Sequence, residues 1–442
     1  MSDNSKLQAV ADSFKNLVAN LGTSRDKRTA GTYAIATLTD DLLATIYRTS
    51  WMGRKTVDIP ANDATRKWRE WLAEADQIEK IDAHEKRLLL PQKVRLALQY
   101  SRLYGGSGIY FSIDGDDPAL PLDLSTVKAD SLAFATVLPR SVLSAGDIDL
   151  DPMSENYGFP RWYDIAGDTK TAQRIDPSRL ALFTGAERLD TGISGVNSGW
   201  GDSVLQSAYD AIQNADSTAA NTASLVYEAR VDVLQIPDLA NIMADPRQRE
   251  LLETRVELSA MLKGNNGMMI IDGDEKYEQK TYTFAGLPDI EYQSLQAVSG
   301  ASDIPLTRFL GQSPAGMNST GESDLKNYYD SINSTQNLMI TPALENLDEC
   351  LIRSALGDRP EEVAFEWSSL WQMSDEQKSK ISKEAAEMIK SLADSGLFMD
   401  DDLAEAAANM LVEHSILPSF EFNEMTEEED EDDDDEFEED ET

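Results

Sequence analysis

The feature that most constrains the fold is a long helical pattern at residues 203–229 whose apolar positions are mostly alanine. These positions recur every three or four residues, the spacing of one helix face. They are Leu205, Ala208, Ile212, Ala215, Ala219, Ala223 and Val226. The pattern predicts a helix of roughly 25 residues, about 40 Å long. Because alanine buries little area, this seam cannot stabilise an isolated helix, so the helix must pack closely against helices of this chain or of other subunits.

The chain has 442 residues, which predicts two or three structural units with ample length for a large core. Its one cysteine, Cys350, cannot form an intramolecular disulfide. No cationic and apolar leader is visible, so we expect a reducing, cytosolic compartment. No stretch approaches 18 uninterrupted apolar residues, so no membrane span is expected.

The charge balance is strongly acidic. Lys and Arg number 39 against 80 Asp and Glu, so the formal net charge is −41. Residues 427–442 contain 14 acids and no base, which leaves about −27 for the rest of the chain. A protein that grips DNA phosphates needs Lys and Arg, so this balance argues against a tight nucleic-acid binder. The tail at 416–442 is expected to be disordered, since it cannot bury a core.

The N-terminal part is predicted to be mainly helical. An amphipathic helix is expected at 7–21, followed by a basic patch, and helices are expected throughout 40–99. Trp68 and Trp71 stand among several bases, and such a mixture can stack single-stranded nucleic acid. We favour the alternative that both tryptophans lie on one helix face and pack a core while the bases extend to solvent.

The next part changes to short strands at 109–113, 132–138, 162–165 and 180–183, which makes the fold class α+β. A Gly/Ser/Asn-rich stretch at 192–201 is a natural hinge. Beyond the alanine-seamed helix, an insert at 231–284 is predicted to contain a helix that begins at Asp245 and Pro246. A hairpin of strands 268–271 and 277–284, turning at Asp272 and Gly273, is expected to follow.

The C-terminal half is again helical. A helix at 290–302 is followed by a loop at 304–321 that is dense in Pro, Gly, Ser and Asn. A long helix at 322–356 contains Pro342, which costs about 3 kcal/mol or more inside a helix, so the helix must kink or restart there. A helix pair is predicted at 374–411.

Residues suited to catalysis or metal binding are sparse. Two histidines, His84 and His414, nearly exclude catalytic arrangements that need a histidine pair. No phosphate-binding loop motif occurs, and the glycines at 105–108 are read as a strand entrance. The acids at 147, 149 and 151 resemble the start of a calcium loop. However, Pro152 occupies the position that needs glycine, and Gly158 occupies the position that needs the bidentate Glu. We therefore predict no catalytic residue, no cofactor and no metal site.

Four segments resemble portal proteins of tailed double-stranded DNA bacteriophages. The most specific is ASDIPLTRFLGQSPAGMNSTGESDLKNYYDSI at 301–332. Pieces of one portal subgroup follow the same order: YRTSWMGRKTVDIPANDATRKWREW at 47–71, SRLYGGSGIYFSIDG at 101–115 and FEWSSLWQMSDEQKSK at 365–380. The resemblance covers most of residues 47–411.

This resemblance implies the portal fold, with wing, stem, clip and crown, assembled as a cyclic ring of twelve subunits around a DNA channel. The expected parts are an N-terminal and wing region at 1–201, stem helices at 202–230 and 286–303, a clip at 231–285, a tunnel loop at 304–321, a kinked helix returning to the wing at 322–373, and a crown at 374–415. The residues expected to project into the channel are Gln312, Ser313, Pro314, Ala315, Gly316, Met317 and Asn318.

The resemblance also implies a location and partners. The ring would occupy one capsid vertex of the virion, after assembly in the host cytoplasm. It would pass double-stranded DNA without sequence specificity and contact the terminase large subunit, a head-completion or adaptor protein, and the major capsid and scaffolding proteins. An acidic channel would let DNA slide without holding it. Two other interpretations stay open, a head-assembly or scaffolding protein and a DNA-processing enzyme.

Overall fold

The structure is a computed structural model, which describes residues 37–154, 156–165, 173–188, 200–227, 230–262, 274–281, 284–311, 321–371 and 375–395. The chain divides into two units, Met1–Ser368 and Ser369–Thr442, and each is described by itself. The predicted N-terminal helix and basic patch, the second crown helix and the acidic tail lie outside the described residues.

The first described region is a group of helices with well-defined ends. They are α2 (Asp40–Thr49), α3 (Trp51–Arg66), α4 (Ala75–Leu88) and α5 (Leu90–Tyr104). The side chains of Thr39 and Ser50 accept backbone N–H groups at the starts of α2 and α3, which satisfies donors that a helix start leaves unpaired. Gly105, with a φ of 88°, ends α5 in the left-handed conformation that favours glycine.

Two three-stranded antiparallel sheets follow. The first has the order β3-β2-β7 and the second the order β4-β5-β6. The strands are β2 (Gly106–Ile113), β3 (Leu132–Pro139), β4 (Leu143–Ala145), β5 (Tyr163–Ile165), β6 (Gln173–Ile175) and β7 (Leu180–Thr184). The four strands predicted from the sequence are confirmed as β2, β3, β5 and β7. The α+β class is thereby confirmed, and β4 and β6 are short strands that the sequence did not indicate.

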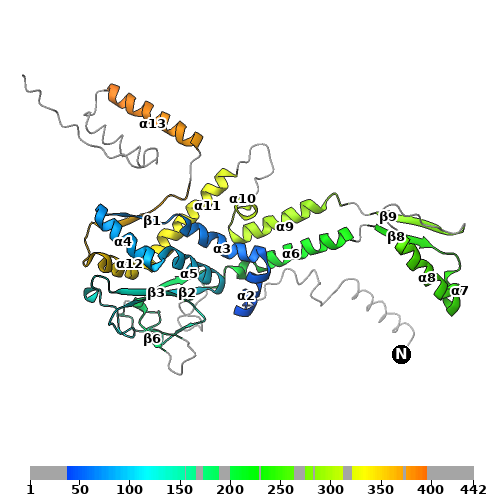
Figure 1. Ribbon diagram of the computed structural model, residues 1–442, viewed down its shortest axis with the longest axis horizontal. Coiled ribbons are helices and arrows are strands. Elements are labelled where there is room, and N and C mark those ends of the chain that lie inside the picture. The colour runs from blue at the N-terminus through cyan, green and yellow to red at the C-terminus, as the bar shows by residue number, and fades with distance from the viewer. Residues whose placement is uncertain are drawn as a thin grey trace, which may run out of the picture. The chain divides into compact units, whose positions relative to one another are not determined.

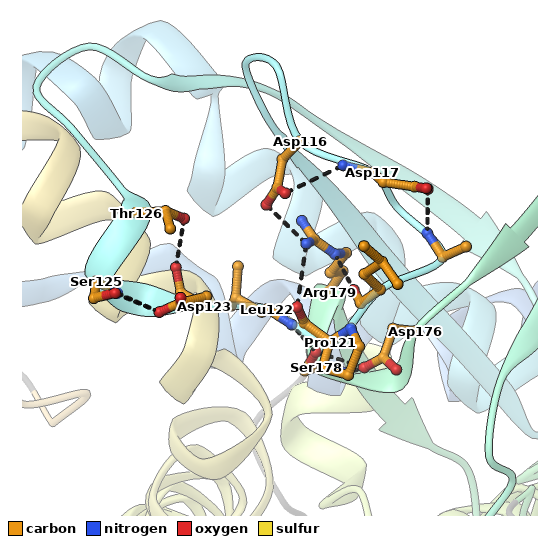
Figure 2. Close-up of polar contacts among 12 residues, drawn as sticks. Asp116, Asp117, Pro121, Leu122, Asp123, Ser125, Thr126, Asp176, Ser178 and Arg179 are labelled. Carbon is orange, nitrogen blue, oxygen red and sulfur yellow. Dashed lines mark hydrogen bonds and ion pairs between the residues drawn. The ribbon is translucent and has the colours of Figure 1, made fainter.

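A buried arginine just before β7 binds the long connection between β2 and β3. Arg179 ends a short 3-10 helix (Pro177–Arg179), and its guanidinium donates to the carbonyl of Leu120 at 2.8 Å and to the carboxylate of Asp116 at 2.7 Å. Figure 2 shows these bonds beside the turns that Asp123 and Asp176 cap. A charge at this depth is tolerated because its donors are paired.

A two-stranded sheet corrects one prediction about the tryptophans. Residues Arg69–Leu72 form β1, which pairs antiparallel with β10 (Ala364–Trp367). Trp68 and Trp71 therefore do not share a helix face. Trp71 is buried as expected, but the neighbouring Arg69 is buried too instead of extending to solvent. The prediction was wrong because the strand's partner lies almost 300 residues away, where local spacing carries no information about it.

The alanine-seamed segment forms α6 (Leu205–Tyr227), which lies beside α9 (Leu287–Ser302), as Figure 1 shows. Between them in sequence come β8 (Arg230–Gln235), α7 (Leu239–Ala244), α8 (Pro246–Leu262) and β9 (Lys276–Thr281). Among the residues described, β9 pairs antiparallel with β8. The hairpin partner predicted at 268–271 falls outside the described residues, and the predicted helix start at Pro246 is confirmed.

The last part of the first unit is an interrupted helix. A short helix, α10 (Leu306–Leu310), occupies part of the segment predicted as loop. The long helix consists of α11 (Glu322–Thr335), a π-helical turn (Gln336–Ile340) and α12 (Thr341–Leu356), and Gly357 ends it with a φ of 89°. In the second unit the structure describes α13 (Asp375–Ser395), which falls within the first of the two crown helices predicted.

The core of the first unit is built around α5, β2, β7 and α12, where α5 and β7 contact β2 and α12 contacts β7. Fully buried side chains from these elements include Val94, Ile109, Leu344, Leu347 and Leu351. A smaller apolar cluster joins the second sheet to the segment before α6 through Tyr163 and Trp200. Of the helices in the described ranges, none is long and apolar enough to cross a bilayer.

Candidate functional site

Helix α6 is covered by its own chain over only half of its length. Leu205, Ala208, Ile212 and Ala215 are buried, whereas Ala219 and Ala223 on the same stripe are exposed. The burial of this stripe by residues of the same chain therefore ends after about three turns, although α9 continues beside the helix. The rest of the stripe is available to another molecule.

The neighbouring helix α9 is buried near its C-terminal end and exposed near its N-terminal end. Val298, near its C-terminal end, is fully buried, while Ile290 and Tyr292, near its N-terminal end, are exposed. Neither α6 nor α9 contains Lys or Arg, and their ionisable acids are Asp210, Asp216, Asp289 and Glu291. The pair therefore combines exposed apolar positions with a purely negative charge.

The segment expected to project into the channel runs between α10 and α11, and Gln312–Asn318 fall outside the described residues. Its two ends are described. Gly311 has a φ of 70° and ends α10, and Gly321 has a φ of 67° and precedes α11. Both values lie in the left-handed region, so glycine suits both ends.

The two flanks of this segment meet at one buried carboxylate, Asp63 on α3, which is 1% exposed. Arg308 of α10 donates two hydrogen bonds to it, from Nε to Oδ2 at 3.0 Å and from Nη2 to Oδ1 at 2.9 Å. The hydroxyl of Tyr328 on α11 donates to Oδ2 at 3.0 Å. The guanidinium of Arg66 lies 3.9 Å from Oδ1. Asp63 is thus a shared acceptor for two elements that follow it by about 250 residues.

These bonds are reflected in the ionisation of the donors. The hydrogen bond to Asp63 raises the pKa of Arg308 above its usual value, although partial burial opposes the rise. Burial raises the pKa of Tyr328, and the charge of Asp63 raises it further. Both donors therefore stay protonated over the whole physiological range and keep their hydrogens for the bonds to Asp63.

Helix α3 holds α10 at a second point. The ammonium of Lys55 donates to the carbonyl of Phe309 at 2.5 Å, which satisfies an acceptor that the end of α10 leaves unpaired. The rings of Trp51 and Phe309 pack with their centroids 5.8 Å apart, and Phe309 is fully buried. Helix α10 is therefore fixed to α3 by charge, hydrogen bond and packing together.

The predicted kink at Pro342 coincides with a change of helical hydrogen bonding. The π-helical turn precedes Pro342 by two residues, and Thr341 donates its backbone N–H to the carbonyl of Gln336. Gln336 is fully buried, and its amide donates to the carbonyl of Ala64 on α3 at 2.8 Å. Pro342 has no N–H, so the interruption falls where the proline removes a helical bond.

A cavity of about 860 Å³ lies beside this cluster, lined by α3, α5, α11 and the segment before α6. Arg102 on its wall donates to the carbonyl of Thr56 at 2.9 Å, and burial lowers the pKa of its guanidinium to about 10. Within the described ranges no group of three His, Cys, Asp or Glu side chains is placed to hold a metal ion.

Sequence reasoning did not single out Asp63, Arg308 or Tyr328. Asp63 lies in an ordinary helical stretch, and its partners are 245 and 265 residues away. The available signal was positional, because Asp63 falls within 47–71 and both partners fall within 301–332, two of the segments that resemble portal proteins.

Comparisons with known proteins agree with that resemblance. A family model described as phage portal protein matches residues 42–391. A protein of Caulobacter sp. (strain RHG1), named anti-CBASS protein Acb1, is 40% identical over 425 residues, which cover 93% of this chain and 68% of that protein. A protein of the same name from Sphingomonas paeninsulae is 37% identical over 425 residues, covering 94% of this chain and 68% of that protein.

A solved structure titled "Neck of empty GTA particle computed with C6 symmetry" superposes with a TM-score of 0.51. The match covers 88% of this chain and 97% of the other, at 12% sequence identity. At this identity the likeness concerns the fold.

Proposed function

The chain belongs to the phage portal protein family, and from this premise we propose that it assembles into a ring of twelve subunits around a DNA channel. The proposal rests on the proposed stem pair, helices α6 and α9, whose apolar residues are only partly buried by the chain itself. Helices α6 and α9 bury their apolar residues at one end and leave Ala219, Ala223 and Ile290 exposed at the other. A closed ring covers such surfaces on every subunit with the same contact.

The charge of the stem pair supports the channel. Helices α6 and α9 carry acids and no bases, so DNA beside them would find no counterion partner. A weakly repulsive wall lets a duplex slide while a separate motor supplies the work. We propose that Gln312–Asn318, a segment without Lys, Arg, Asp or Glu, contacts the passing DNA.

The remaining expectations are part of the same proposal. The clip at 231–285 would dock the terminase large subunit and the head-completion protein in turn. The wing would face the major capsid and scaffolding proteins at a unique vertex of the virion, after assembly in the host cytoplasm. The proposed domains have the boundaries expected from the sequence: 1–201, 202–230, 231–285, 286–303, 304–321, 322–373, 374–415 and 416–442.

We propose no enzymatic role for this chain, because its family is a structural one. The name anti-CBASS protein belongs to relatives with about a third of their length outside the match. We therefore assign that name's activity to no residue here. Incubating the purified protein with ATP, or with DNA and Mg²⁺, should give no turnover above buffer.

Electron microscopy and native mass spectrometry test the ring. Twelve copies of 48.9 kDa give about 587 kDa, and negative-stain images should show rings with a central hole. A scaffolding protein or a DNA-processing enzyme would show no such ring. Monomers or dimers alone at micromolar concentration, across salt conditions, would contradict the proposal.

A further inference from the structure

We propose that Asp63 is a positioning residue that fixes the spacing between the two ends of the segment at 312–320. The inference rests on the proposed function only where it predicts packaging. Its structural content concerns α3, α10 and α11, which the structure describes.

The first step is geometric. Gly311 and Gly321 end the two described flanks, and each flank is bound to helix α3. Both are bound to the same carboxylate, α10 through Arg308 and α11 through Tyr328. Because one acceptor serves both, moving either helix away from α3 breaks a bond to Asp63.

The second step is energetic. Asp63 is 1% exposed, so an unpaired charge there would be costly, and its two oxygens are occupied by Arg308 and Tyr328. A bidentate arginine also fixes an angle as well as a distance. The cluster therefore has one low-energy arrangement, in which both flanks are docked.

The third step separates Asp63 from a simple stabiliser of the fold. Further contacts with α3 each involve one flank: Lys55 and Trp51 hold α10. On the other flank, Arg66 lies over the ring of Tyr329, and Ala64 accepts from Gln336 at the end of α11. Losing any one of them loosens one flank. Losing Asp63 loosens both at once.

Hydrogen exchange of the full-length protein tests this. In D63N we expect amides of α10 and α11 to exchange at least about tenfold faster, the factor that 1.4 kcal/mol of local stability represents, while β2 and β3 change less than about twofold. The variant Y328F keeps the aromatic ring of residue 328 and removes its hydrogen bond to Asp63. In this variant the amides of α11 should exchange faster, and those of α10 should not.

The matched control is D348N. Asp348 is also a nearly buried carboxylate bonded to an arginine, but it lies on α12 and pairs with Arg69 on β1. Its loss should speed exchange in β1, α4 and α12 and leave α10 and α11 at the wild-type rate. If D63N does not fold, Y328F still tests the bond between Asp63 and α11, and wild-type exchange in α11 of Y328F overturns the inference.

Three outcomes overturn the inference: wild-type exchange in α10 or α11 of D63N, wild-type exchange in α11 of Y328F, and equal acceleration of α10 and α11 in D348N. A packaging assay with D63N rings separates the two proposals. Faster exchange with unchanged packaging would leave Asp63 as the positioning residue and contradict the channel role of the segment.

Discussion

Arg69 on β1 and Asp348 on α12, 279 residues apart in sequence, form a bidentate ion pair in the interior of the first unit, with Nη2 and Oδ1 2.6 Å apart. Glu85 on α4 accepts from the same guanidinium at 2.8 Å, and the rings of Trp71 and Phe365 lie against it. Burial alone would lower the pKa of Arg69, but the two carboxylates raise it above its usual value. One charged side chain thus connects β1, α4 and α12.

The first prediction concerns this pair. Asp348→Ala should lower the free energy of unfolding by about 3–5 kcal/mol, because it leaves Arg69 buried with one fewer counterion. Urea unfolding followed by circular dichroism measures the change. Asp76→Ala is the control, since Asp76 and Lys80 form an exposed pair, and it should cost less than about 1 kcal/mol. Equal losses in the two variants would contradict the prediction.

The second prediction concerns pH. Burial raises the pKa of the Glu85 carboxyl, and Arg69 opposes only part of this rise. A carboxyl with a higher pKa in the folded chain binds its proton preferentially there. Wild type should therefore gain stability relative to Glu85→Gln as the pH falls from 7 toward about 4.3, the usual Glu pKa. Urea unfolding of both proteins at several pH values in this range tests it. A constant stability difference would show that the pKa of Glu85 is not raised.

The helices and the central strands could be predicted because their signals are local. The spacing of α6, Pro246 at the start of α8 and Pro342 at the start of α12 are all visible within a few residues. The pairing of β1 with β10, the burial of Arg69 and the contacts of Asp63 depend on residues hundreds of positions away. A charged residue next to tryptophan looks the same in sequence whether it reaches water or a buried carboxylate.

The third prediction concerns Gly105, where α5 meets β2. Its carbonyl accepts from the N–H groups of Gly185 and Gly201, its φ is 88°, and an added Cβ would overlap the carbonyl oxygen of Gly201. Gly105→Ala should therefore cost more than about 3 kcal/mol in urea unfolding, since strain and overlap add. Gly115→Ala is the control, because Gly115 has a φ of 81° and open space around its Cβ. It should cost about 1–2 kcal/mol. Similar costs at both positions would mean that the close approach at Gly105 is unimportant.

The fourth prediction concerns the stem. The double variant A219E/A223E places two charges on the exposed part of the alanine stripe, where they would be desolvated in a ring. We expect native mass spectrometry to find single chains of 48.9 kDa instead of rings of about 587 kDa. The control N214E/N221E adds the same charge to exposed positions about 180° around the helix, and it should still form rings. Intact rings in the first variant would show that the stripe is not an interface.

The last prediction concerns the proposed channel segment. The double variant S313K/N318K would add two cations per subunit, about 24 in a ring of twelve, and each new phosphate contact increases salt-sensitive retention of DNA. We expect rings of normal mass that package DNA slowly or not at all at low salt, with partial recovery as salt rises and screens the contacts. The control T136K/S144K adds as many cations at exposed positions on β3 and β4 of the proposed wing, and it should package at the wild-type rate. If S313K/N318K rings package as fast as wild type at low salt, then residues 312–318 do not contact the moving DNA, and the acidic stem helices α6 and α9 would be left as the only part of the proposed channel that the described residues support.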